Sequence, residues 1–515
     1  MRRKANHPKG EREMELNFPE IELIPVDTFG GRVHVKWDNQ ASLTPLGQLA
    51  FFIEFLKTSG HFERWVSDCP MDFTSPNAPM KRDVLGTILL SVLSGHTRYS
   101  HITTIRCDGV NPQLLGMNKV VSDDAVGRAL KYNLEEAAGI KWSRESLKMT
   151  YYPLLSDPWI LDVDTSVKVL YGKQEGAVVG YNPKKPGRPS HVYHAYMIAN
   201  IRLILDVEVQ AGNKNASKYT APGLWTFLNA LPESHRPAFI RGDSGFGTDA
   251  IMREAEATGQ KYLFKLKQTA NVKKLIRRYT RYQEWVHVRQ GWEGIESSIK
   301  LQGWDCSRRV VILRRLLPKD LGVMVQDRRS GQLEIQFPEI KEDLKVYEYG
   351  VMVTSLEDEI STIAQHYRDR ADSENNFDEL KNQWGWCGFT TRDLKRSQMM
   401  AKIIALVYNW WTLFVRLIEP KKHMEALTSR PLLLHAVGKK TIHANQTTLV
   451  VSSTHGESPR IHRRLAHLSQ FFKNLNTTTP QLTIAEKWYR ILSVAFIKYL
   501  KGRILKPPDL IPAVI

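Results

Sequence analysis

A predicted charged helix at residues 367–381 places four chemically versatile side chains on one ridge. At about 100° per residue, their positions fall within about 60° of the helix circumference. The four residues are Tyr367, Arg370, Glu374 and Lys381. A phenol, a guanidinium, a carboxylate and an ammonium group in one row could together hold phosphate oxygens and a metal ion. The simpler alternative is a solvated helix face on which Arg370 and Glu374 form an i, i+4 ion pair.

Aspartates at two predicted strands could complete a site with Glu374. In "ILDVDTS", Asp162 and Asp164 fall on the same face of a strand of otherwise apolar character. In "FIRGDSGFG", Asp243 follows an apolar strand and stands beside glycine, which allows a ligand to approach closely. Sites in α/β sheets form at strand ends, where the chain turns and leaves a crevice. Taken singly, each aspartate would more often be a turn residue or a helix cap.

Three carboxylates brought together would repel one another, and their pKa values would rise unless a cation neutralised them. Hard oxygen ligands in that number suit Mg²⁺ or Mn²⁺. Two such ions can activate an attacking water or 3′-hydroxyl and stabilise the leaving oxygen of a phosphodiester. Arg370 and Lys381 would then hold neighbouring phosphates, and Tyr367 would offer a hydroxyl or a stacking face.

The spacing and order of these residues resemble a known family. Tyr-x2-Arg-x3-Glu-x6-Lys is similar to the signature of bacterial insertion-sequence transposases, which are cut-and-paste DDE enzymes with an RNase H-like catalytic core. The segments "DVDTS" and "RGDSGF" resemble their first and second aspartate motifs, and "GYNPKKPGRPS" resembles a segment after the first strand. The resemblance covers roughly residues 80–415.

The resemblance implies that Asp164, Asp243 and Glu374 are the catalytic and metal-binding triad. It favours Asp164 over Asp162, because Ser166 follows two places later, and Asp162 remains an alternative. It also implies two Mg²⁺ (or Mn²⁺) ions as cofactors, double-stranded DNA of transposon ends and target as the partner, and a homodimer in the active complex.

Six residues are expected to contact DNA: Tyr367, Arg370, Lys381, Lys184, Lys185 and Arg188. In relatives, the Tyr-Arg-Lys residues and an insertion before the last helix help to hold a flipped base and a hairpin at the transposon end. The segment "KKPGRP" at 184–189 resembles a minor-groove hook, and the alternative is a basic turn. Three tryptophans of the insertion, Trp285, Trp292 and Trp304, could stack on a base, although core packing is the simpler interpretation for each.

Bulk composition agrees with a DNA-binding protein. The 515 residues suggest about three domains, and a formal charge of +18 is most simply explained by a polyanionic partner. The alternative explanation is a basic proteome or scattered surface lysines. Four widely spaced cysteines predict buried thiols in a reducing compartment, and the N-terminus lacks the apolar region of a secretory signal. The apolar stretch 399–418 is interrupted by charges and predicts a buried core helix. Together with the family resemblance, this predicts a bacterial cytosolic, nucleoid-associated protein without membrane contact.

The patterning predicts an α/β protein with a mixed-sheet core, a β-rich insertion, and helical regions at both ends, and the resemblance implies that the core is RNase H-like. The element order from residue 158 is β-β-β-α-β-α-β, which favours a mixed sheet over a doubly wound one. The helices of 43–135 fit a helix-turn-helix reader or a plain helical bundle equally well. A C-terminal amphipathic helix with a capping box at Thr483 and Glu486 fits the core better than a dimer interface.

Five segments follow from these patterns. They are an N-terminal arm with a helical DNA-binding region (1–150), the first part of the core (151–269), the β-rich insertion (270–356), the last part of the core with the signature helix (357–418), and a C-terminal helical region (419–515). The predicted function is transposition: binding of terminal inverted repeats, cutting of the ends and joining of 3′-hydroxyls to target DNA. The alternatives are an RNase H-like nuclease that does not join ends and a domesticated DNA-binding protein without catalysis.

Overall fold

The computed structural model describes residues 23–38, 41–182, 185–214, 221–280, 284–316, 347–453 and 456–507, and the backbone of 324–326 and 333–335. The chain divides into two compact units, Met1–Ser42 and Leu43–Ile515. In the first unit, β1 (Ile24–Thr28) and β2 (Gly31–Val35) form an antiparallel hairpin, and the strand-like segment "GGRVHVKW" supplies its second strand.

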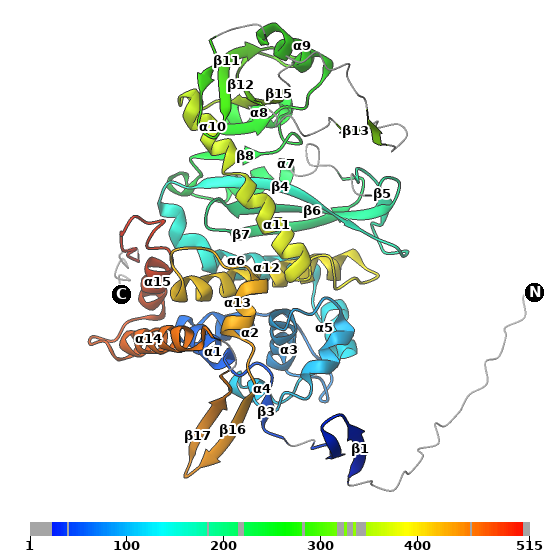
Figure 1. Cartoon of the computed structure of the whole chain (residues 1–515), viewed down its shortest axis with the longest axis vertical. Coiled ribbons are helices and arrows are strands. Elements are labelled where there is room, and N and C mark those ends of the chain that lie inside the picture. Colours follow the sequence, from blue (N-terminus) through cyan, green and yellow to red (C-terminus); the bar gives the residue numbers. More distant parts are fainter. Residues whose placement is uncertain are drawn as a thin grey trace, which may run out of the picture. The chain divides into compact units, whose positions relative to one another are not determined.

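A ten-stranded mixed sheet organises the second unit (Figure 1). Its strands follow the order β10-β11-β12-β15-β9-β8-β4-β6-β5, and β7 pairs with β6. The bounds are β4 Ile160–Val169, β5 Val178–Val179, β6 Pro189–Ile198, β7 Leu203–Ala211, β8 Phe239–Gly242, β9 Tyr262–Lys265, β10 Val286–His287, β11 Trp292–Ile299, β12 Arg308–Leu316 and β15 Tyr347–Thr354. Two further strands, β13 (Met324–Gln326) and β14 (Leu333–Ile335), form a separate two-stranded sheet.

The centre of the large sheet combines antiparallel and parallel pairing. Strand β4 pairs antiparallel with β6 and parallel with β8, and β8 pairs parallel with β9. Helix α7 (Ala221–Asn229) precedes β8, and α8 (Asp249–Ala257) provides the crossover that the parallel strands β8 and β9 require. The predicted mixed sheet is therefore confirmed, and the predicted element order differs by one added strand, the two-residue β5.

Strands of the segment 270–356 extend this same sheet. Strand β15 pairs antiparallel with β9, and β12, β11 and β10 follow outward from it. The segment also contains a helix, α9 (Ala270–Tyr279), which the β-rich prediction omits. The buried residues Val272, Leu275 and Ile276 of α9 have helical spacing, but the basic residues between them obscure so short a stripe.

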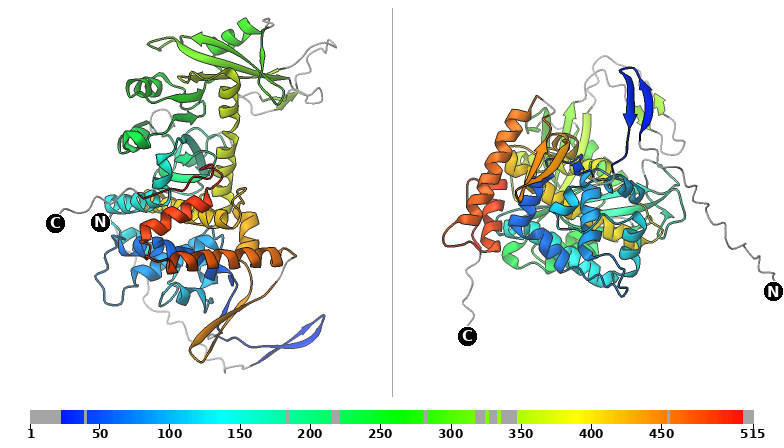
Figure 2. Two further views of the ribbon diagram at one scale, coloured as in Figure 1. Left: turned by 90° about the vertical axis from the view of Figure 1, so that its left-hand side faces the viewer. Right: turned by 90° about the horizontal axis from the view of Figure 1, so that it is seen from below.

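Helix α12 (Leu394–Ile418) is buried along most of its length and packs on α6 and β7 (Figures 1 and 2). By length and composition it could cross a membrane, but its most apolar window is entirely buried inside the protein, which confirms the predicted core helix. Its polar residues find partners on β7. Lys402 pairs with Asp206, and the Asn409 amide bonds both the N–H and the C=O of Ile204.

Helices from both ends of the second unit surround α12. Their bounds are α1 Leu49–Ser59, α2 His61–Ser67, α3 Lys81–Leu93, α4 Asn111–Leu114, α5 Asp123–Tyr132, α6 Glu136–Tyr151, α13 Ala426–Leu433, α14 Ser458–Thr477 and α15 Ile484–Ala495. Short 3₁₀ helices occupy Tyr99–Ile105, Tyr152–Ser156 and Glu233–His235. Helix α1 packs on α14, α15 and α12. Strands β16 (Gly438–His443) and β17 (Gln446–Val451) form a hairpin that pairs with β3 (Leu43–Thr44).

Local signals place several of these helices correctly. The Ser122 hydroxyl caps α5 by accepting from the Ala125 N–H, and Gly95 adopts a left-handed φ of 79° just after α3. The predicted capping box of Thr483 and Glu486 opens α15. The apolar stripe of α15 is buried, so this helix belongs to the core, as expected.

The segment predicted as one signature helix forms two, α10 (Ile360–Arg368) and α11 (Ala371–Gln383). Asp369 and Arg370 lie between them with right-handed helical backbone angles. The Arg370 N–H bonds to the Tyr367 C=O, an i, i+3 contact that tightens the chain locally. The ridge therefore crosses a helix junction, so that uniform 100° spacing does not describe it.

In "SLED", residues 355–358, the spacing of Ser355 and Asp358 predicts a capping box at the start of the signature helix, and this prediction is wrong. Helix α10 begins only after Glu359, and no side chain caps it. The Ser355 hydroxyl instead accepts a hydrogen bond from the Tyr262 N–H at 3.0 Å, because β15 and β9 are neighbours in the sheet. The backbone of Tyr262, 93 residues away in sequence, thus bonds the Ser355 hydroxyl that a capping box would use for the helix.

The prediction of buried thiols holds for one cysteine and is wrong for three. All four are free; Cys69 is buried, whereas Cys107, Cys306 and Cys387 are exposed. The three exposed residues lie in turns or bends, where the chain runs along the surface.

Candidate active site

Two predicted site residues, Asp164 and Asp243, lie where the parallel pairing of β4 and β8 ends: Asp164 in the middle of β4, and Asp243 directly after β8. The register pairs Val163 of β4 with Gly242 of β8, so the residues that follow this last pair are Asp164 and Asp243. The Asp164 carboxylate accepts from the Thr165 N–H at 2.7 Å, and that of Asp243 accepts from the Gly245 N–H at 2.8 Å. The carboxyl end of a parallel pair thus presents two acids side by side.

Asp162, the alternative first acid, has a different environment. Both of its oxygens bond the Arg241 guanidinium, at 2.5 and 2.7 Å, and the Ser373 hydroxyl also donates to it. Asp162 is 2% exposed and Arg241 is fully buried. These bonds occupy the lone pairs of Asp162 and leave Asp164 as the β4 carboxylate that faces the strand ends.

Arg370 joins Asp164 to Glu374. Its Nη2 donates to Asp164 Oδ2 at 2.9 Å, and its Nη1 donates to Glu374 Oε1 at 2.7 Å. Arg370 is buried, whereas the Glu374 side chain is 64% exposed. The i, i+4 pair that a solvated face would contain is therefore present, but its guanidinium is also held by an acid from the sheet.

The electrostatics of this cluster raise the pKa of Asp164 to about 7. Burial is the largest cause, and the nearby charges of Asp243 and Glu374 add to it, whereas Arg370 and the Thr165 N–H oppose it. A buried carboxylate with a raised pKa beside other acids is a feature of functional sites. The cluster holds three acids and one arginine, so it would gain from a further cation.

The donor set fits a hard divalent cation, because all three acids offer carboxylate oxygens. Among the described residues, no group of three His, Cys, Asp or Glu side chains is close enough together to hold a metal ion. The Arg370 guanidinium lies between Asp164 and Glu374 and balances the charge of both carboxylates. A metal ion that used both acids would replace these two ion pairs.

The two remaining ridge residues lie on different helices. Tyr367 is half-buried in the last turn of α10, and burial raises the pKa of its hydroxyl while the charge of Arg370 lowers it. The Lys265 ammonium of β9 lies 5.9 Å from the centre of the Tyr367 ring. Lys381 lies in the last turn of α11, about 10 Å along the helix axis from Glu374.

Of the predicted basic loop, Lys184 lies outside the described residues. Lys185 and Arg188 are exposed and lie 5.2 and 5.6 Å from the centre of the Tyr171 ring. Gly187 between them has a φ of 78°, as a tight turn requires. Residues 185–188 are exposed, and both described cations of the loop lie against Tyr171.

The three tryptophans of the insertion each lie beside an arginine of β12. Trp285 and Trp304 are buried, and Trp292 is half-buried. Arg314 lies 4.0 Å from the Trp285 ring centre, and Arg315 and Arg308 lie 5.0 and 5.2 Å from those of Trp292 and Trp304. Burial favours core packing for Trp285 and Trp304, as the simpler interpretation has it.

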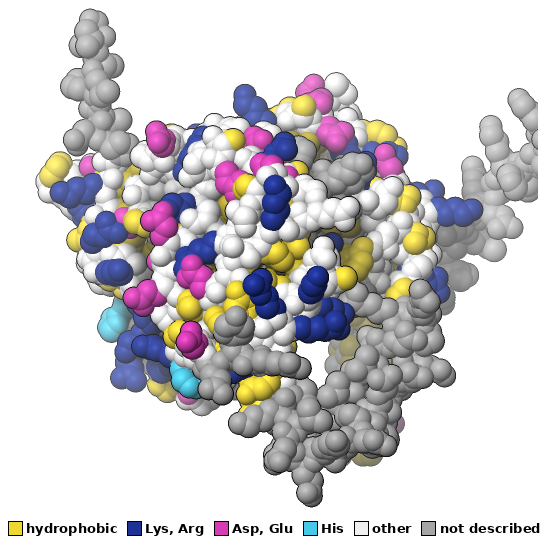
Figure 3. All heavy atoms as spheres, turned by 90° about the horizontal axis from the view of Figure 1, so that it is seen from above, with side chains coloured by type: hydrophobic (Ala, Val, Ile, Leu, Met, Phe, Trp, Pro, Cys, Tyr) yellow, Lys and Arg dark blue, Asp and Glu magenta, His cyan; other side chains and the backbone are white. Residues whose placement is uncertain are grey.

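Sequence reasoning missed Arg241 and Ser373, which fix the first acid strand against α11. Both stand close to predicted site residues, Arg241 two places before Asp243 and Ser373 directly before Glu374. No local pattern marks either residue, because their bonds to Asp162 span 79 and 211 residues of the chain. The net charge gives no guide either: on the face seen from above, basic and acidic side chains are interspersed (Figure 3).

The family described as "Transposase DDE domain group 1" matches residues 79–472. No curated protein matches the chain. Among solved structures, the cryo-EM structure of a piggyBac transposase synaptic complex with hairpin DNA is similar, with 9% identity and a TM-score of 0.39. The match covers 91% of this chain and 87% of that one. Because the family match extends over more than half of the chain, this protein belongs to the transposase family with the group 1 DDE domain.

Proposed function

We propose that this protein is the transposase of a bacterial insertion sequence, which binds terminal inverted repeats, cuts the DNA ends and joins 3′-hydroxyls to target DNA. One observation carries the proposal: Asp164 and Asp243 directly follow the last paired residues of the parallel strands β4 and β8, and Glu374 meets Asp164 through a shared arginine. The strand order β7-β6-β4-β8-β9, with its antiparallel and parallel halves, supports an RNase H-like core.

Asp164, Asp243 and Glu374 would hold two Mg²⁺ or Mn²⁺ ions. When bound, such ions activate the attacking oxygen and stabilise the leaving one. Arg370 would then bind a DNA phosphate, because its fork of donors suits phosphate as well as carboxylate. Asp162 and Arg241 position β4 against β8, and the Ser373 hydroxyl fixes α11, which carries Glu374, on the same pair.

The remaining parts of the proposal concern DNA and assembly. Tyr367 and Lys381 would hold the cut end, and Lys185 and Arg188 would contact the flanking duplex together with Lys184. Two copies of the chain would bring two transposon ends together in the bacterial cytosol, on the nucleoid. All of these contacts involve phosphates, so the affinity for DNA should fall steeply with salt.

Cleavage of a labelled duplex that carries the element's own end tests the proposal. Asp243→Ala and Glu374→Ala should abolish Mg²⁺-dependent cleavage and leave end binding nearly intact. Cleavage that survives both changes would refute the mechanism.

A second assay separates the proposal from its alternatives. Pre-cleaved ends incubated with target DNA should give strand-transfer products. Cleavage without such products would identify a nuclease, and binding without either reaction would identify a DNA-binding protein that has lost catalysis.

A further inference from the structure

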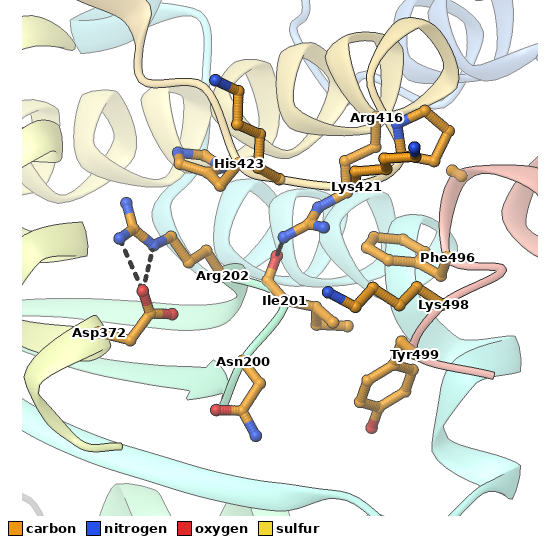
Figure 4. A pocket seen from close by; sticks show the side chains of 13 residues that line it. Asn200, Ile201, Arg202, Asp372, Arg416, Lys421, His423, Phe496, Lys498 and Tyr499 are labelled. Carbon is orange, nitrogen blue, oxygen red and sulfur yellow. Dashed lines mark hydrogen bonds and ion pairs between the residues drawn. The ribbon is translucent and has the colours of Figure 1, made fainter. Parts of the chain in front are cut away.

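A basic pocket lies near the candidate active site, at the C-terminal end of α12. A cavity of about 410 Å³ is lined by residues of the β6–β7 turn, α11, the end of α12 and the segment after α15 (Figure 4). We call it the Arg416 pocket. Its charged lining comprises five basic side chains and one acid: Arg202, Arg416, Lys421, Lys422, Lys498 and Asp372. The volume suits a ligand of nucleotide size or smaller.

Arg416 stands out when it is compared with the other polar residues of its own helix face. Lys402, Asn409 and Arg416 follow one another at seven-residue intervals, so all three face β7 and its turn. The first two are satisfied there, Lys402 by Asp206 and Asn409 by both backbone groups of Ile204. Arg416 is the third member of the row, and its partners are incomplete.

Arg416 is 9% exposed, and the single described hydrogen bond of its guanidinium is a 3.5 Å contact from Nη2 to the Ile201 C=O (Figure 4). Its Nε is buried without a hydrogen-bond partner. Among the described residues, no carboxylate lies within ion-pair distance of it. A buried charge in this condition is costly unless something pairs with it.

Two local interactions compensate Arg416 only in part. It lies in the last turn of α12, where the helix dipole favours a cation by about 0.3–1 kcal/mol. It also lies 5.3 Å from the Phe496 ring centre, a contact worth about 0.5–2 kcal/mol. Neither supplies an oxygen to the unpaired Nε.

The other groups of the pocket point to an anion. The Arg202 side chain is already balanced, because Asp372 accepts from it at 2.6 and 2.9 Å and Glu379 lies at 3.5 Å. Lys421, Lys422 and Lys498 are exposed at the rim. The positive charge of the rim is therefore available, and the acid of the pocket is not.

Phosphate fits this donor set better than a single carboxylate does. An arginine fork and several mobile ammonium groups can together surround the oxygens of a phosphate. Arg202 itself has a φ of 58°, in the left-handed region, which its ion pair with Asp372 holds in place at the pocket wall. One part of the pocket wall is thus fixed by the Arg202–Asp372 ion pair, and the rim carries exposed lysines.

We propose that the Arg416 pocket binds a phosphate group through Arg416, Lys421 and Lys498, supplied by a DNA strand or by a small phosphorylated molecule. The pocket is distinct from the candidate active site. Its β6–β7 turn follows Ile198, which pairs with Leu161, three residues or roughly 10 Å along β4 from Asp164. The two sites share α11, because Asp372 faces Arg202 and Glu374 faces Arg370.

The decisive experiment is calorimetric titration of the full-length protein with inorganic pyrophosphate. The wild-type protein should bind one pyrophosphate. Lys421→Gln combined with Lys498→Gln should weaken binding about tenfold or more, because two charges beside the phosphate are removed. Lys273→Gln combined with Lys274→Gln, which alters two exposed lysines of α9, is the matched control and should change binding less than about twofold. Absence of binding, or equal weakening in both pairs, would overturn the proposal.

A thermal measurement tests Arg416 itself. Pyrophosphate should raise the melting temperature of the wild type, since a ligand of the folded state stabilises it. Arg416→Gln should melt at the same temperature with and without pyrophosphate, and a shift as large as that of the wild type would remove Arg416 from the site. If this variant fails to fold, the lysine pair still decides the matter.

Fluorescence anisotropy with a random-sequence duplex assigns the source of the phosphate. For a DNA phosphate, pyrophosphate should compete with the duplex, and the lysine pair should reduce the slope of log K against log salt by about 2. For a small molecule, duplex binding of the lysine pair should equal that of the control pair while pyrophosphate binding is lost. Either result supports the site. Cleavage assays are not involved, so this test stands apart from that of the transposase proposal.

Discussion

Asp162 and Asp164 lie two residues apart on the same face of β4, yet their surroundings differ. Asp162 is enclosed by a buried arginine and a serine hydroxyl that satisfy both of its oxygens. Asp164 shares Arg370 with Glu374, lies beside Asp243, and has a pKa raised to about 7. One half of the strand face is thus neutralised within the fold, and the other half accumulates like charge.

Lys168, four residues beyond Asp164 on the same face, adds a second buried charge to this half of the strand. It is 4% exposed, donates to the Gly388 C=O, and belongs to none of the ion pairs among the described residues. Burial lowers its pKa to about 8. Strand β4 is therefore stabilised by a paired charge at its beginning, whereas Asp164 and Lys168 further along carry shifted pKa values, as groups in functional sites commonly do.

The largest effect is expected where the half of β4 with accumulated like charge carries the chemistry. Asp164→Asn should lower the DNA cleavage rate at least about a thousandfold, because a metal ligand is lost, while the fold persists. The measurement is cleavage of an end duplex in Mg²⁺, with circular dichroism to check folding. Asp378→Asn, an exposed acid of α11, is the control and should cleave normally. Cleavage by Asp164→Asn at the control rate would assign the first acid elsewhere.

The neutralised half should respond in stability instead. Asp162→Ala leaves Arg241 buried and unpaired, so the free energy of unfolding should fall by about 3–5 kcal/mol. Urea denaturation measures this change. Asp162→Leu combined with Arg241→Met removes both charges and should restore most of the loss. Equal instability of the single and the double variant would show that packing, rather than the ion pair, sustains this part of β4.

The effect of Lys168 on stability should depend on pH. Its folded pKa of about 8 lies below the unfolded value of 10.5, so its contribution to stability is present above pH 10.5 and is lost as pH falls to about 8. At pH 7, Lys168→Met should therefore raise the free energy of unfolding by about 2 kcal/mol, after loss of one hydrogen bond.

The gain in Lys168→Met should shrink as pH rises from 8 to 10 in urea denaturation. Lys273→Met, at an exposed position, should show no such trend. A gain that stays constant with pH would indicate better packing instead of relief of a buried charge.

The positions of the site acids follow from the sequence because short-range patterns place them. Alternation within "ILDVDTS" puts Asp162 and Asp164 on one face, and the glycines of "RGDSGF" mark the end of the next strand. The partner of each acid depends on strand register and on contacts across 79 residues for Asp162 and 206 for Asp164. No local pattern encodes such contacts, so the different roles of the two acids emerge only in the fold.

The helical elements show the same limit. Apolar spacing predicts α12 as a core helix, but the partners of Lys402 and Asn409, and the incomplete partners of Arg416, depend on β7 and its turn. The junction between α10 and α11 also escapes a periodic pattern, because residues 369 and 370 keep helical angles while the hydrogen bonding tightens. Fold class was therefore accessible from sequence, and the sharing of Arg370 between two acids was not.

The smallest expected effect concerns that shared arginine. Arg370→Gln removes the positive charge between Asp164 and Glu374, so the carboxylates should attract a divalent cation more strongly. The affinity for Mn²⁺ in the absence of DNA, measured by electron paramagnetic resonance, should rise about fivefold, or about 1 kcal/mol. In Arg368→Gln, the matched control, the lost cation contacts the Val288 C=O and Gln365, not a site acid, so its Mn²⁺ affinity should match that of the wild type. A lower affinity in Arg370→Gln would mean that the guanidinium orients the acids for the metal instead of competing with it, and Arg370 would then belong with Arg241 on the neutralised side of the comparison.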